Sequence, residues 1–292
     1  MGRAILRHIH LGLRNIHIRL LARSEQSLQK LGESAEGVEP VYGDIFSGDI
    51  LEKEMKSCDM VIHLVGIIKE KDGATFEKVH IEGTKCVVDS ARKSGIRHFV
   101  HMSAENARAD APSRYHTTKY QAEEYLKKSG LTYTIMRPSM MFGPEDQNFN
   151  ELAKIICSTP VMPVIGDGSY IWQPVSVDNV AELFVAVLME PRAMGKTYEI
   201  RGPEKFTFEE ILNILMEVTG KTRPRIHIPV AIMKPLASLM DIVSSIAPIT
   251  LEQMKMLLDE KQPPSENFSA DFPIKLTHLE EGLRKFLAPC RP

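Results

Sequence analysis

Short apolar runs of the kind that form buried strands alternate with longer segments whose apolar residues recur at helical spacing. The strand-like runs are 16–22, 38–42, 60–65, 98–103, 132–137, 175–177 and 198–201. The helical segments between them are 28–31, 50–55, 75–94, 115–128, 149–156 and 180–189. This order is typical of successive βαβ units, in which each helix returns the chain to a parallel sheet. We therefore predict an α/β fold with a doubly wound, Rossmann-like parallel sheet.

Beyond residue 138 this alternation weakens, and Pro and Gly residues become frequent. We therefore predict a first domain over 1–138 and a smaller C-terminal lobe over 139–292 that serves mainly as a substrate or partner lobe. The strands expected at 175–177 and 198–201 would return to the sheet of the first domain. The apolar spacing in the lobe predicts helices over 208–219, 230–246, 251–258 and 276–287, with a Pro-rich linker at 262–264.

The first residues do not fit the usual start of such a sheet. A parallel βαβ sheet opens with a buried apolar strand and a Gly-rich turn, whereas Ile5, Leu6 and Ile9 already follow helical spacing. We predict a helix here; the alternative is a strand over 8–13 that forms a hairpin with 16–20. In both interpretations the opening strand and its Gly-rich turn are missing from the sequence.

Composition argues against several classes of protein. The 36 basic and 38 acidic side chains give a formal net charge of −2, which argues against a nucleic-acid-binding protein. The sequence has no run of about 20 uncharged apolar residues, and its N-terminus lacks the apolar core of a signal peptide. These features predict a cytoplasmic protein.

The cysteines and histidines do not predict a metal site. Cys58, Cys86, Cys157 and Cys290 contain no CxxC pair, and no Cys/His cluster has zinc-ligand spacing. We expect all four cysteines to be reduced thiols. The ten histidines are scattered along the chain, so we predict no bound metal.

Ser103, Tyr115 and Lys119 form the most informative local pattern. Tyr115 and Lys119 are four positions apart, so both side chains would lie on one face of a helix. An ammonium group near a phenol lowers the pKa of the tyrosine, which lets it exchange a proton with a hydroxyl or carbonyl group. Ser103, at the end of the preceding strand, would hydrogen-bond the same oxygen. We predict that these three residues are catalytic; the alternative is a surface Tyr packed over the Lys side chain.

An ordered series of motifs resembles one protein superfamily across nearly the whole chain. The motifs are Leu20-Leu21-Ala22-Arg23-Ser24, Tyr42-Gly43-Asp44-Ile45, Val61-Ile62-His63-Leu64-Val65-Gly66, then Ser103, Tyr115, Lys119 and Arg137-Pro138-Ser139. The series resembles the short-chain dehydrogenase/reductase superfamily, in its extended and atypical branch of NAD-dependent epimerase/dehydratase-like proteins. Residues 173–181 and 251–254 are most similar to the nucleotide-binding accessory subunit of respiratory complex I and its bacterial relatives.

The resemblance implies which residues bind the cofactor. Residues 44–45 would flank the adenine, and the backbone of 64–66 would pass beneath the pyrophosphate and ribose. Lys119 would bind the hydroxyl groups of the nicotinamide ribose, and residues 138–140 would line the nicotinamide. The alternatives are a turn Asp at 44, a tight strand exit at Gly66 and a helix-stopping Pro at 138. The implied cofactor residues are Gly2 (at the third glycine of the family's turn), Asp44, Ile45, Leu64, Val65, Gly66, Lys119, Pro138, Ser139 and Met140.

Arg23 and Ser24 bear on which cofactor the chain binds. Enzymes of this fold that use NAD place Asp or Glu at the end of the second strand to bind the ribose 2′-hydroxyl, whereas an Arg there accommodates a 2′-phosphate. The corresponding end reads Ala22-Arg23-Ser24, with no carboxylate before Glu25. We therefore predict that NADP(H) is favoured over NAD(H). The alternative is that Arg23 is a solvated loop residue.

The sequence departs from the family pattern in two places. The missing strand would be the central one, and its neighbours would be left with unpaired backbone groups that cost about 1–3 kcal/mol each when buried. We hypothesise that the sequence starts at an internal codon, roughly ten residues after the natural start, so that it binds cofactor poorly and folds marginally. In addition, Met140 replaces the Asn of the epimerase motif over 137–144, which argues against a nucleotide-sugar substrate.

Two functions of different classes follow from the resemblance. The first is an NAD(P)-dependent oxidoreductase or epimerase-like enzyme, in which hydride moves to or from nicotinamide while Tyr115, assisted by Lys119, transfers a proton. Its substrate would be a small carbonyl or hydroxyl compound or a quinone-like ligand. The alternative is a non-catalytic NADP(H)-binding accessory or assembly protein of the respiratory complex I type. It implies contact with a respiratory complex or a membrane surface, peripheral to the inner membrane.

Overall fold

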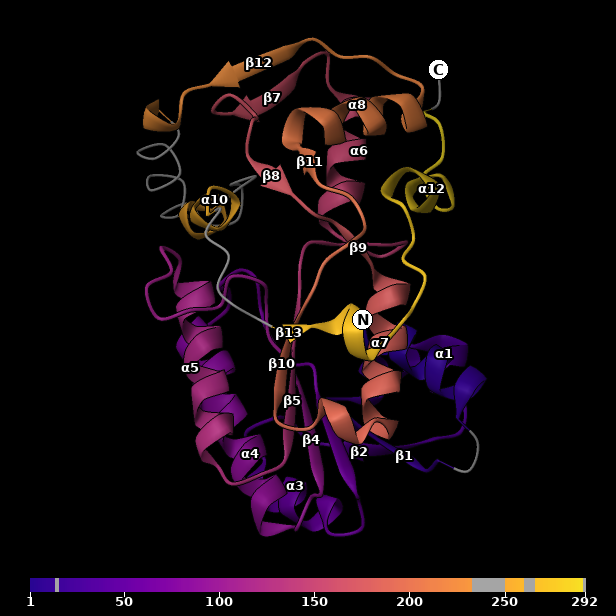
Figure 1. The fold of residues 1–292 in the computed structure, drawn as a ribbon, viewed down its shortest axis with the longest axis vertical. Coiled ribbons are helices and arrows are strands. Elements are labelled where there is room, and N and C mark those ends of the chain that lie inside the picture. Colours follow the sequence, from indigo (N-terminus) through magenta and orange to yellow (C-terminus); the bar gives the residue numbers. More distant parts are fainter. Residues whose placement is uncertain (14–15, 233–249, 260–265, 291–292) are drawn as a thin grey trace. The chain divides into compact units, whose positions relative to one another are not determined.

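The computed structural model describes residues 1–13, 16–232, 250–259 and 266–290, and the chain divides into two compact units (Figure 1). The first unit comprises Met1–Arg137, Val180–Glu199 and Pro263–Ile274. The second comprises Pro138–Asn179, Ile200–Gln262 and Lys275–Pro292.

The first unit is built on parallel strands, which confirms the predicted α/β class. Its larger sheet has five strands, and the pairs β3–β4 and β4–β5 within it are parallel. A separate sheet pairs β1 (Ile18–Ala22) with β2 (Val38–Tyr42), also in parallel. In sheet order, the five strands are β13 (Glu266–Asn267), β10 (Lys196–Ile200), β5 (Tyr133–Pro138), β4 (His98–Met102) and β3 (Met60–His63).

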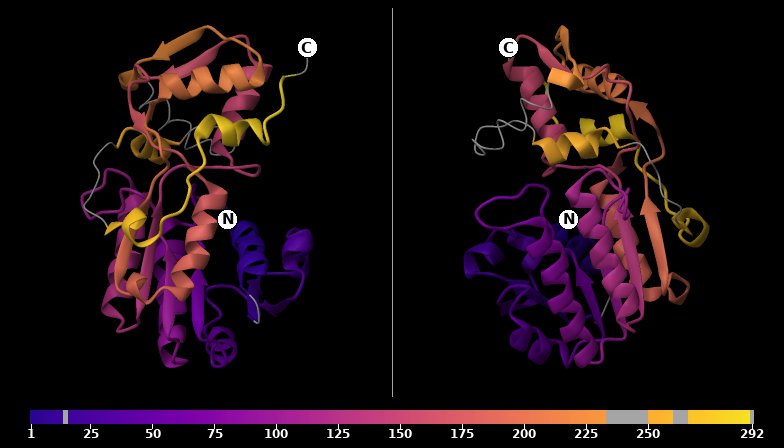
Figure 2. Two further views of the ribbon diagram at one scale, coloured as in Figure 1. Left: turned by 45° about the vertical axis from the view of Figure 1, so that its right-hand side comes forward. Right: turned by 90° about the vertical axis from the view of Figure 1, so that its left-hand side faces the viewer.

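The helices of the first unit cover both faces of the larger sheet. Figures 1 and 2 show α4 and α5 on one face and α7 on the other. The buried apolar residues between the sheet and α3–α5 include Val88, Phe99, Leu126 and Ile135. The helices are α1 (Gly2–Gly12), α2 (Glu25–Gln29), α3 (Gly48–Met55), α4 (Thr84–Lys93), α5 (Arg114–Lys128) and α7 (Val177–Met189), with 3₁₀ turns at Gly32–Ala35 and Pro191–Ala193.

The chain begins as a helix, as its apolar spacing predicts. Helix α1 buries Ala4, Ile5, Leu6 and Ile9 on one side. The hairpin alternative is wrong, because residues 8–12 belong to this helix. The predicted helix at 28–31 is displaced: α2 ends at Gln29 and a 3₁₀ turn follows.

Strands β1 and β3 belong to different sheets. Neither the β1–β2 pair nor the five-stranded sheet contains a strand that joins β1 to β3 in the described part of the chain. Strand β3 accordingly has the character of an edge: Met60 is 37% exposed and Val61 and Ile62 are half-buried, whereas 98–101 in β4 are buried. Strand β3 is thus an edge strand among the described strands, and its first residues are partly exposed rather than buried.

A π-helix interrupts the helix that the sequence predicts over 75–94. It spans Glu77–Gly83 and continues directly into α4. A larger residue at Gly83 would displace the buried side chain of Ile45, because a Cβ atom here would overlap Cδ1 of Ile45. Such insertions of one extra residue per turn occur frequently at functional sites.

The second unit has its own apolar core, formed mainly by Phe149, Ile156, Leu212, Leu215 and Leu283. Helix α8 is fixed at its start by a reciprocal capping box between Thr207 and Glu210. The helices predicted at 208–219, 251–258 and 276–287 are present, whereas most of the one at 230–246 and the linker at 262–264 lie outside the described residues. The elements are α6 (Asn148–Ser158), α8 (Phe208–Thr219), α10 (Leu251–Leu257), α11 (Phe268–Asp271, in the first unit), α12 (Leu279–Arg284), and the strand pairs β6 (Met141–Phe142) with β9 (Val175–Ser176), β7 (Met162–Ile165) with β12 (Arg225–Ile228), and β8 (Ile171–Trp172) with β11 (Phe206–Thr207).

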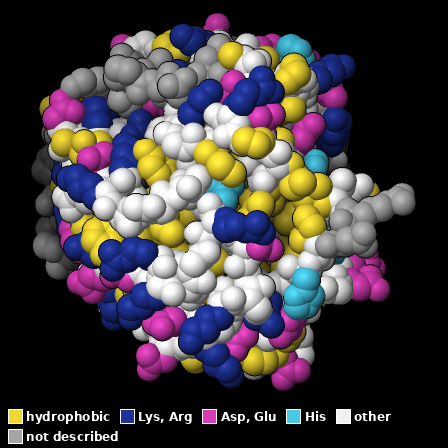
Figure 3. All heavy atoms as spheres, turned by 60° about the horizontal axis from the view of Figure 1, so that its bottom comes forward, with side chains coloured by type: hydrophobic (Ala, Val, Ile, Leu, Met, Phe, Trp, Pro, Cys, Tyr) yellow, Lys and Arg dark blue, Asp and Glu magenta, His cyan; other side chains and the backbone are white. Residues whose placement is uncertain are grey.

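Acidic and basic side chains are mixed on the face shown in Figure 3, as the near-zero net charge leads one to expect. None of the helices in the described ranges is both long enough and apolar enough to cross a bilayer.

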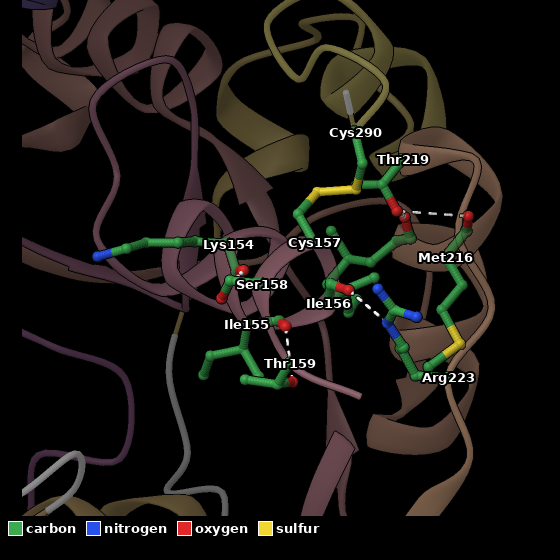
Figure 4. Close-up of a disulfide and its surroundings, with 11 residues drawn as sticks. Lys154, Ile155, Ile156, Cys157, Ser158, Thr159, Met216, Thr219, Arg223 and Cys290 are labelled. Carbon is green, nitrogen blue, oxygen red and sulfur yellow. Dashed lines mark hydrogen bonds between the residues drawn. A yellow bond between two sulfur atoms is a disulfide. The ribbon is translucent and has the colours of Figure 1, made fainter. Parts of the chain in front are cut away.

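The expectation that all four cysteines are reduced is wrong for two of them. Cys157, in α6, and Cys290, near the C-terminus, form a disulfide in the second unit (Figure 4). The backbone N–H of Cys290 donates to the carbonyl oxygen of Thr219 at 2.8 Å, which holds the C-terminal segment beside α8 and brings the two Cα atoms to 5.4 Å. Cys58 and Cys86 are free, as expected.

Candidate functional site

The carboxyl ends of β3 and β4 meet at one edge of the larger sheet. His63 pairs with His101 across the two strands, so the segments that follow them emerge side by side. After β3 come Leu64, Val65 and Gly66, and Ser103 follows β4 directly. In doubly wound sheets, ligands bind outside these ends of the strands.

Lys119 projects from α5 into this edge of the sheet. Ser113 caps the helix by accepting a hydrogen bond from the backbone N–H of His116, which sets the position of the first turn. The Lys119 side chain is only 3% exposed, and its Nζ donates to the carbonyl oxygen of Met102 at 3.1 Å. Burial lowers the pKa of Lys119 to about 8, although the nearby Glu123 carboxylate opposes this effect.

Gly66 allows the chain leaving β3 to approach Lys119 closely. A Cβ atom at this position would lie 2.7 Å from Nζ of Lys119 and 3.5 Å from Nε2 of His80. Any larger residue would displace the ammonium group or the strand exit. The structure therefore brings the predicted cofactor-binding segment 64–66 together with Lys119.

Tyr115 lies one turn before Lys119 on α5. Its ring contacts His80 edge-on at a centroid distance of 5.5 Å and Phe76 at 6.0 Å. Burial raises the pKa of Tyr115 to about 12. This direction is opposite to the expected effect of Lys119, because the burial of Tyr115 dominates and the Lys119 ammonium is directed at Met102. At neutral pH the Tyr115 hydroxyl is therefore protonated, and burial makes it a weaker acid than a solvent-exposed tyrosine.

Ser103 lies at the same edge with an unused hydroxyl group. Its residue is 2% exposed, and its Oγ has no hydrogen-bond partner in the described part of the chain. A buried hydroxyl without a partner is costly unless a ligand or water satisfies it. The Ser103 hydroxyl is therefore available to a bound oxygen atom.

Three buried histidines, His63, His80 and His101, surround these residues, and no sequence motif predicts them as site residues. The rings of His63 and His101 stack at 5.3 Å, and Nε2 of His63 lies 3.1 Å from Oγ1 of Thr84. His80 comes from the π-helix. His63 and His101 each lie two residues before the end of a predicted strand, 60–65 and 98–103, and this shared position is the signal that would have identified them. In the described ranges, no three His, Cys, Asp or Glu side chains are arranged to hold a metal ion.

The N-terminal end of α1 lies beside the exit of β3. A Cβ atom on Gly2 would be 3.9 Å from Cδ1 of Leu64. The first backbone N–H groups of a helix are available to an anion, and the helix dipole favours negative charge there. Gly2 and Leu64, two of the residues implied to bind cofactor, are therefore neighbours.

A second group of predicted residues lies at the carboxyl ends of β1 and β2. The backbone N–H of Gly43 donates to the carbonyl oxygen of Ala22 at 3.1 Å. Arg23 and Asp44, which follow β1 and β2, therefore lie on adjacent strand exits. Arg23 is exposed, and Ser24 caps α2 by accepting from the N–H of Ser27. The predicted 2′-phosphate contact would thus be made by an accessible Arg.

Asp44 and Ile45 already have contacts within the protein. Oδ1 of Asp44 accepts from the N–H of Phe46 at 2.8 Å and from the Ser47 hydroxyl at 3.1 Å, as a turn Asp does. Oδ2 would remain for an adenine amino group. The Ile45 side chain is 6% exposed and packs on Gly83, so only its backbone would flank a ligand.

Pro138, Ser139 and Met140 fall at the start of the second unit. Pro138 ends β5, and the Ser139 hydroxyl donates to the carbonyl oxygen of Gln173 at 2.7 Å. Met140 packs against the core of the second unit.

Comparisons with known proteins identify a nucleotide-binding relationship. The model of a family described as NAD(P)H-binding matches residues 1–191. The chain is 30% identical over 230 residues to NADH dehydrogenase (ubiquinone) 1 alpha subcomplex subunit 9 of Arabidopsis thaliana, covering 78% of this chain and 57% of that protein. It is 27% identical over 210 residues to a ceramide reductase of Caulobacter vibrioides, covering 72% and 65% respectively. The chain thus spans little more than half the length of the respiratory relative.

The fold has counterparts among solved structures. Triphenylmethane reductase of Citrobacter sp., solved with NADP(H), superposes with a TM-score of 0.74 at 19% identity and covers 97% of this chain and 95% of its own. At this identity the likeness concerns the fold, which is the one predicted from the alternation of strands and helices.

Proposed function

The chain belongs to the NAD(P)H-binding family, and we propose that within it the protein is an NAD(P)-dependent oxidoreductase or epimerase-like enzyme that uses Ser103, Tyr115 and Lys119. The observation that carries the proposal is the meeting of Lys119 with Gly66 and Met102 at the carboxyl ends of β3 and β4. A lysine buried to this degree without a carboxylate against its ammonium group costs stability, which is typical of a functional site.

The residues of this edge fit the ribose and nicotinamide end of such a cofactor. Gly66 leaves the strand exit uncovered by a side chain, and Lys119 uses one of its three N–H donors on Met102, which leaves two for ribose hydroxyl groups. The N-terminus of α1, next to Leu64, would accept the pyrophosphate. When bound, the nicotinamide supplies or accepts hydride.

The protein's own side chains would handle the proton and orient the substrate. Tyr115 would donate its hydroxyl proton to a substrate carbonyl oxygen, and Ser103 would hydrogen-bond the same oxygen. Because the Tyr115 phenol is protonated at neutral pH, it holds the proton that reduction of a carbonyl consumes. The substrate class is a small carbonyl or quinone-like compound, and a relative named as a ceramide reductase supports a reductase activity.

The variant Tyr115→Phe tests the catalytic role of Tyr115. Tyr115→Phe removes the proton donor and is expected to lower kcat by about 100-fold, while the Kd for NADPH changes less than about twofold. The measurement is NADPH oxidation with a panel of carbonyl compounds and quinones. Tyr120→Phe, on the same helix, is the matched control and should retain activity. Equal activity of Tyr115→Phe and the wild type would refute the role.

We further propose that NADP(H) is preferred, on account of Arg23. Arg23→Ala is expected to weaken NADPH binding by about tenfold and to leave NADH binding unchanged, because only the 2′-phosphate is recognised by the guanidinium. Fluorescence titration of both nucleotides measures this, with Lys30→Ala as a control for an exposed charge on the adjacent segment. Tighter binding of NADH than of NADPH by the wild type would contradict the preference.

A second candidate function rests on the respiratory relative. That protein is named as a subunit of NADH dehydrogenase, and this chain aligns with it over 230 residues. A non-catalytic, nucleotide-binding accessory or assembly protein, peripheral to the membrane that holds such a complex, is therefore the alternative. Bound nucleotide that no carbonyl compound or quinone oxidises, together with co-purification of respiratory subunits, would favour it over the enzyme.

A further inference from the structure

His80 occupies a central place among the site residues, although neither its sequence context nor the proposed chemistry gives it a role. It lies in the middle of the π-helix Glu77–Gly83 and is 1% exposed. Its ring contacts two other segments: the chain leaving β3, at Ile67, and the N-terminal half of α5, at Tyr115 and Thr118. The extra residue in a turn of π-helix changes the direction in which the side chains point, and here it directs the His80 ring toward Tyr115 and the chain leaving β3.

The hydrogen bonds of His80 join the two segments that carry the site. On one side, Nε2 lies 3.1 Å from the backbone nitrogen of Ile67, next to Gly66. On the other side, Nδ1 lies 2.9 Å from Oγ1 of Thr118, next to Lys119. The ring also meets Tyr115 edge-on at 5.5 Å. One imidazole therefore spans the cofactor segment and the helix of the proposed catalytic pair.

The partners of these two nitrogens determine the tautomer. Thr118 Oγ1 lies 2.7 Å from the carbonyl oxygen of Arg114 and donates its proton there, so it accepts from His80. Nδ1 then carries the proton, and Nε2 is an acceptor for the N–H of Ile67. In the opposite tautomer, Nε2 would donate to the Ile67 carbonyl oxygen at 3.0 Å, but Thr118 would have to release Arg114.

The surroundings of His80 favour its neutral form. The titratable groups that face it are Lys119, His63 and His101, all of them basic, and Tyr115 is uncharged at neutral pH. Burial, with the Lys119 charge as the second cause, lowers the pKa of His80 to about 3. A neutral ring can hold both hydrogen bonds without adding a charge beside Lys119.

We propose that His80 is a positioning residue: as the neutral Nδ1–H tautomer it fixes the backbone at Ile67, and with it Gly66, against Lys119 and Tyr115. The consequence for nucleotide binding rests on the proposed function. The positioning itself does not, because it concerns contacts within the first unit alone.

The tautomer and the anchored backbone are tested without any nucleotide. In the wild type, ¹⁵N-edited NMR of the histidine rings should show His80 with a protonated Nδ1 and an unprotonated Nε2 at pH 7. His80→Phe should increase the amide exchange rate of Ile67 by about tenfold, because the bond to Nε2 is lost. His80→Gln keeps an acceptor near the Nε2 position and should retain the protection of Ile67.

A matched control separates positioning from general destabilisation. His98 is also buried, and its Nε2 lies 2.9 Å from Oγ1 of Thr134, at the opposite end of β4. His98→Phe should lower global stability as His80→Phe does, but it should leave the exchange of Ile67 unchanged relative to neighbouring amides. An Nε2–H tautomer of His80, or equal protection of Ile67 in His80→Phe and His98→Phe, would overturn the proposal.

NADPH titration then measures the consequence for binding. The Kd should rise by about tenfold in His80→Phe and by less than about twofold in His80→Gln and His98→Phe. A wild type that fails to bind NADPH refutes the proposed function, while the tautomer and exchange results still decide the positioning role. Deprotection of Ile67 without any change in Kd would show that the anchored segment does not contact nucleotide and would overturn that part of the inference.

Discussion

Lowering the pH from 7 to 5 is expected to remove about 4 kcal/mol from the free energy of unfolding of the first unit through His63 and His80 alone. Burial lowers the pKa of each of these histidines to about 3, with the charge of Lys119 as the second cause. Burial also lowers the pKa of His98 and His101, so the total loss will be larger. A typical domain has only about 5–15 kcal/mol to lose.

The sign follows from where the protons bind. In the unfolded chain a histidine takes up a proton as the pH falls below about 6.5, whereas the folded chain keeps His63 and His80 neutral until about pH 3. Between these values the unfolded state binds more protons, so stability rises with pH. Each histidine contributes a slope of about 1.4 kcal/mol per pH unit, and its contribution is fully present only above pH 6.5.

Hydrogen exchange of the β3 and β4 amides between pH 5 and 7.5, corrected for the intrinsic rates, measures this slope within the first unit. The slope is set by the difference in bound protons between the unfolded and the folded state. The double variant His63→Gln/His80→Gln should reduce this difference by about two protons, because glutamine does not titrate. His10→Gln, at an exposed position of α1, should leave the slope unchanged. A wild-type stability that is flat between pH 6.5 and 5 would contradict the prediction.

The periodicity of apolar residues predicts the order of helices and strands, because each element that buries one face needs apolar residues at its own spacing. Strands β1 to β5 and helix α1 lie close to their expected positions, since each has to present an apolar face to the core. The π-helix at Glu77–Gly83 could not be predicted in this way, because one extra residue shifts the positions of the apolar residues around the helix but leaves their helical spacing recognisable. The bond between Cys157 and Cys290 escapes it as well, because it joins residues 133 positions apart.

The candidate site could be predicted in its residues but less so in its electrostatics. The spacing of Tyr115 and Lys119 predicts a shared helix face, which α5 confirms. It also suggests a lowered pKa for Tyr115, whereas burial raises that pKa to about 12. Desolvation depends on all the atoms around a group, and no spacing in the sequence encodes it.

Arg137→Met is expected to lower the free energy of unfolding of the first unit by about 3 kcal/mol, because it removes the bidentate guanidinium from the buried Glu123 carboxylate and leaves it the more distant Lys127 ammonium, at 3.8 Å. Nε and Nη2 of Arg137 donate to Glu123 at 2.8 and 2.6 Å, and Nη1 lies 3.7 Å from Glu199. The Glu123 side chain is 0% exposed and that of Glu199 is 1% exposed. The guanidinium thus joins β5 to α5 and β10.

Urea unfolding of the single and double variants isolates this pair. Glu123→Leu/Arg137→Met removes both charges of the bidentate pair and should recover part of the stability that Arg137→Met loses, since apolar replacements of buried pairs are often near neutral. Lys93→Met breaks the exposed pair with Glu52 and should cost less than about 1 kcal/mol. If Arg137→Met loses less free energy of unfolding than the control Lys93→Met, the buried carboxylates are protonated or rehydrated in the variant.

The same pair connects the stability of the sheet to the chemistry of the site. Glu123 lies one turn after Lys119 on α5, and its carboxylate raises the pKa of Lys119 against the effect of burial. Glu123→Gln should therefore lower the pKa of Lys119 below about 8 and move any activity profile that depends on the ammonium form to lower pH. Arg137→Lys, which keeps the charge but not the bidentate geometry, should weaken the fold while leaving that profile in place. A shift of the profile in both variants would instead indicate that α5 itself has moved.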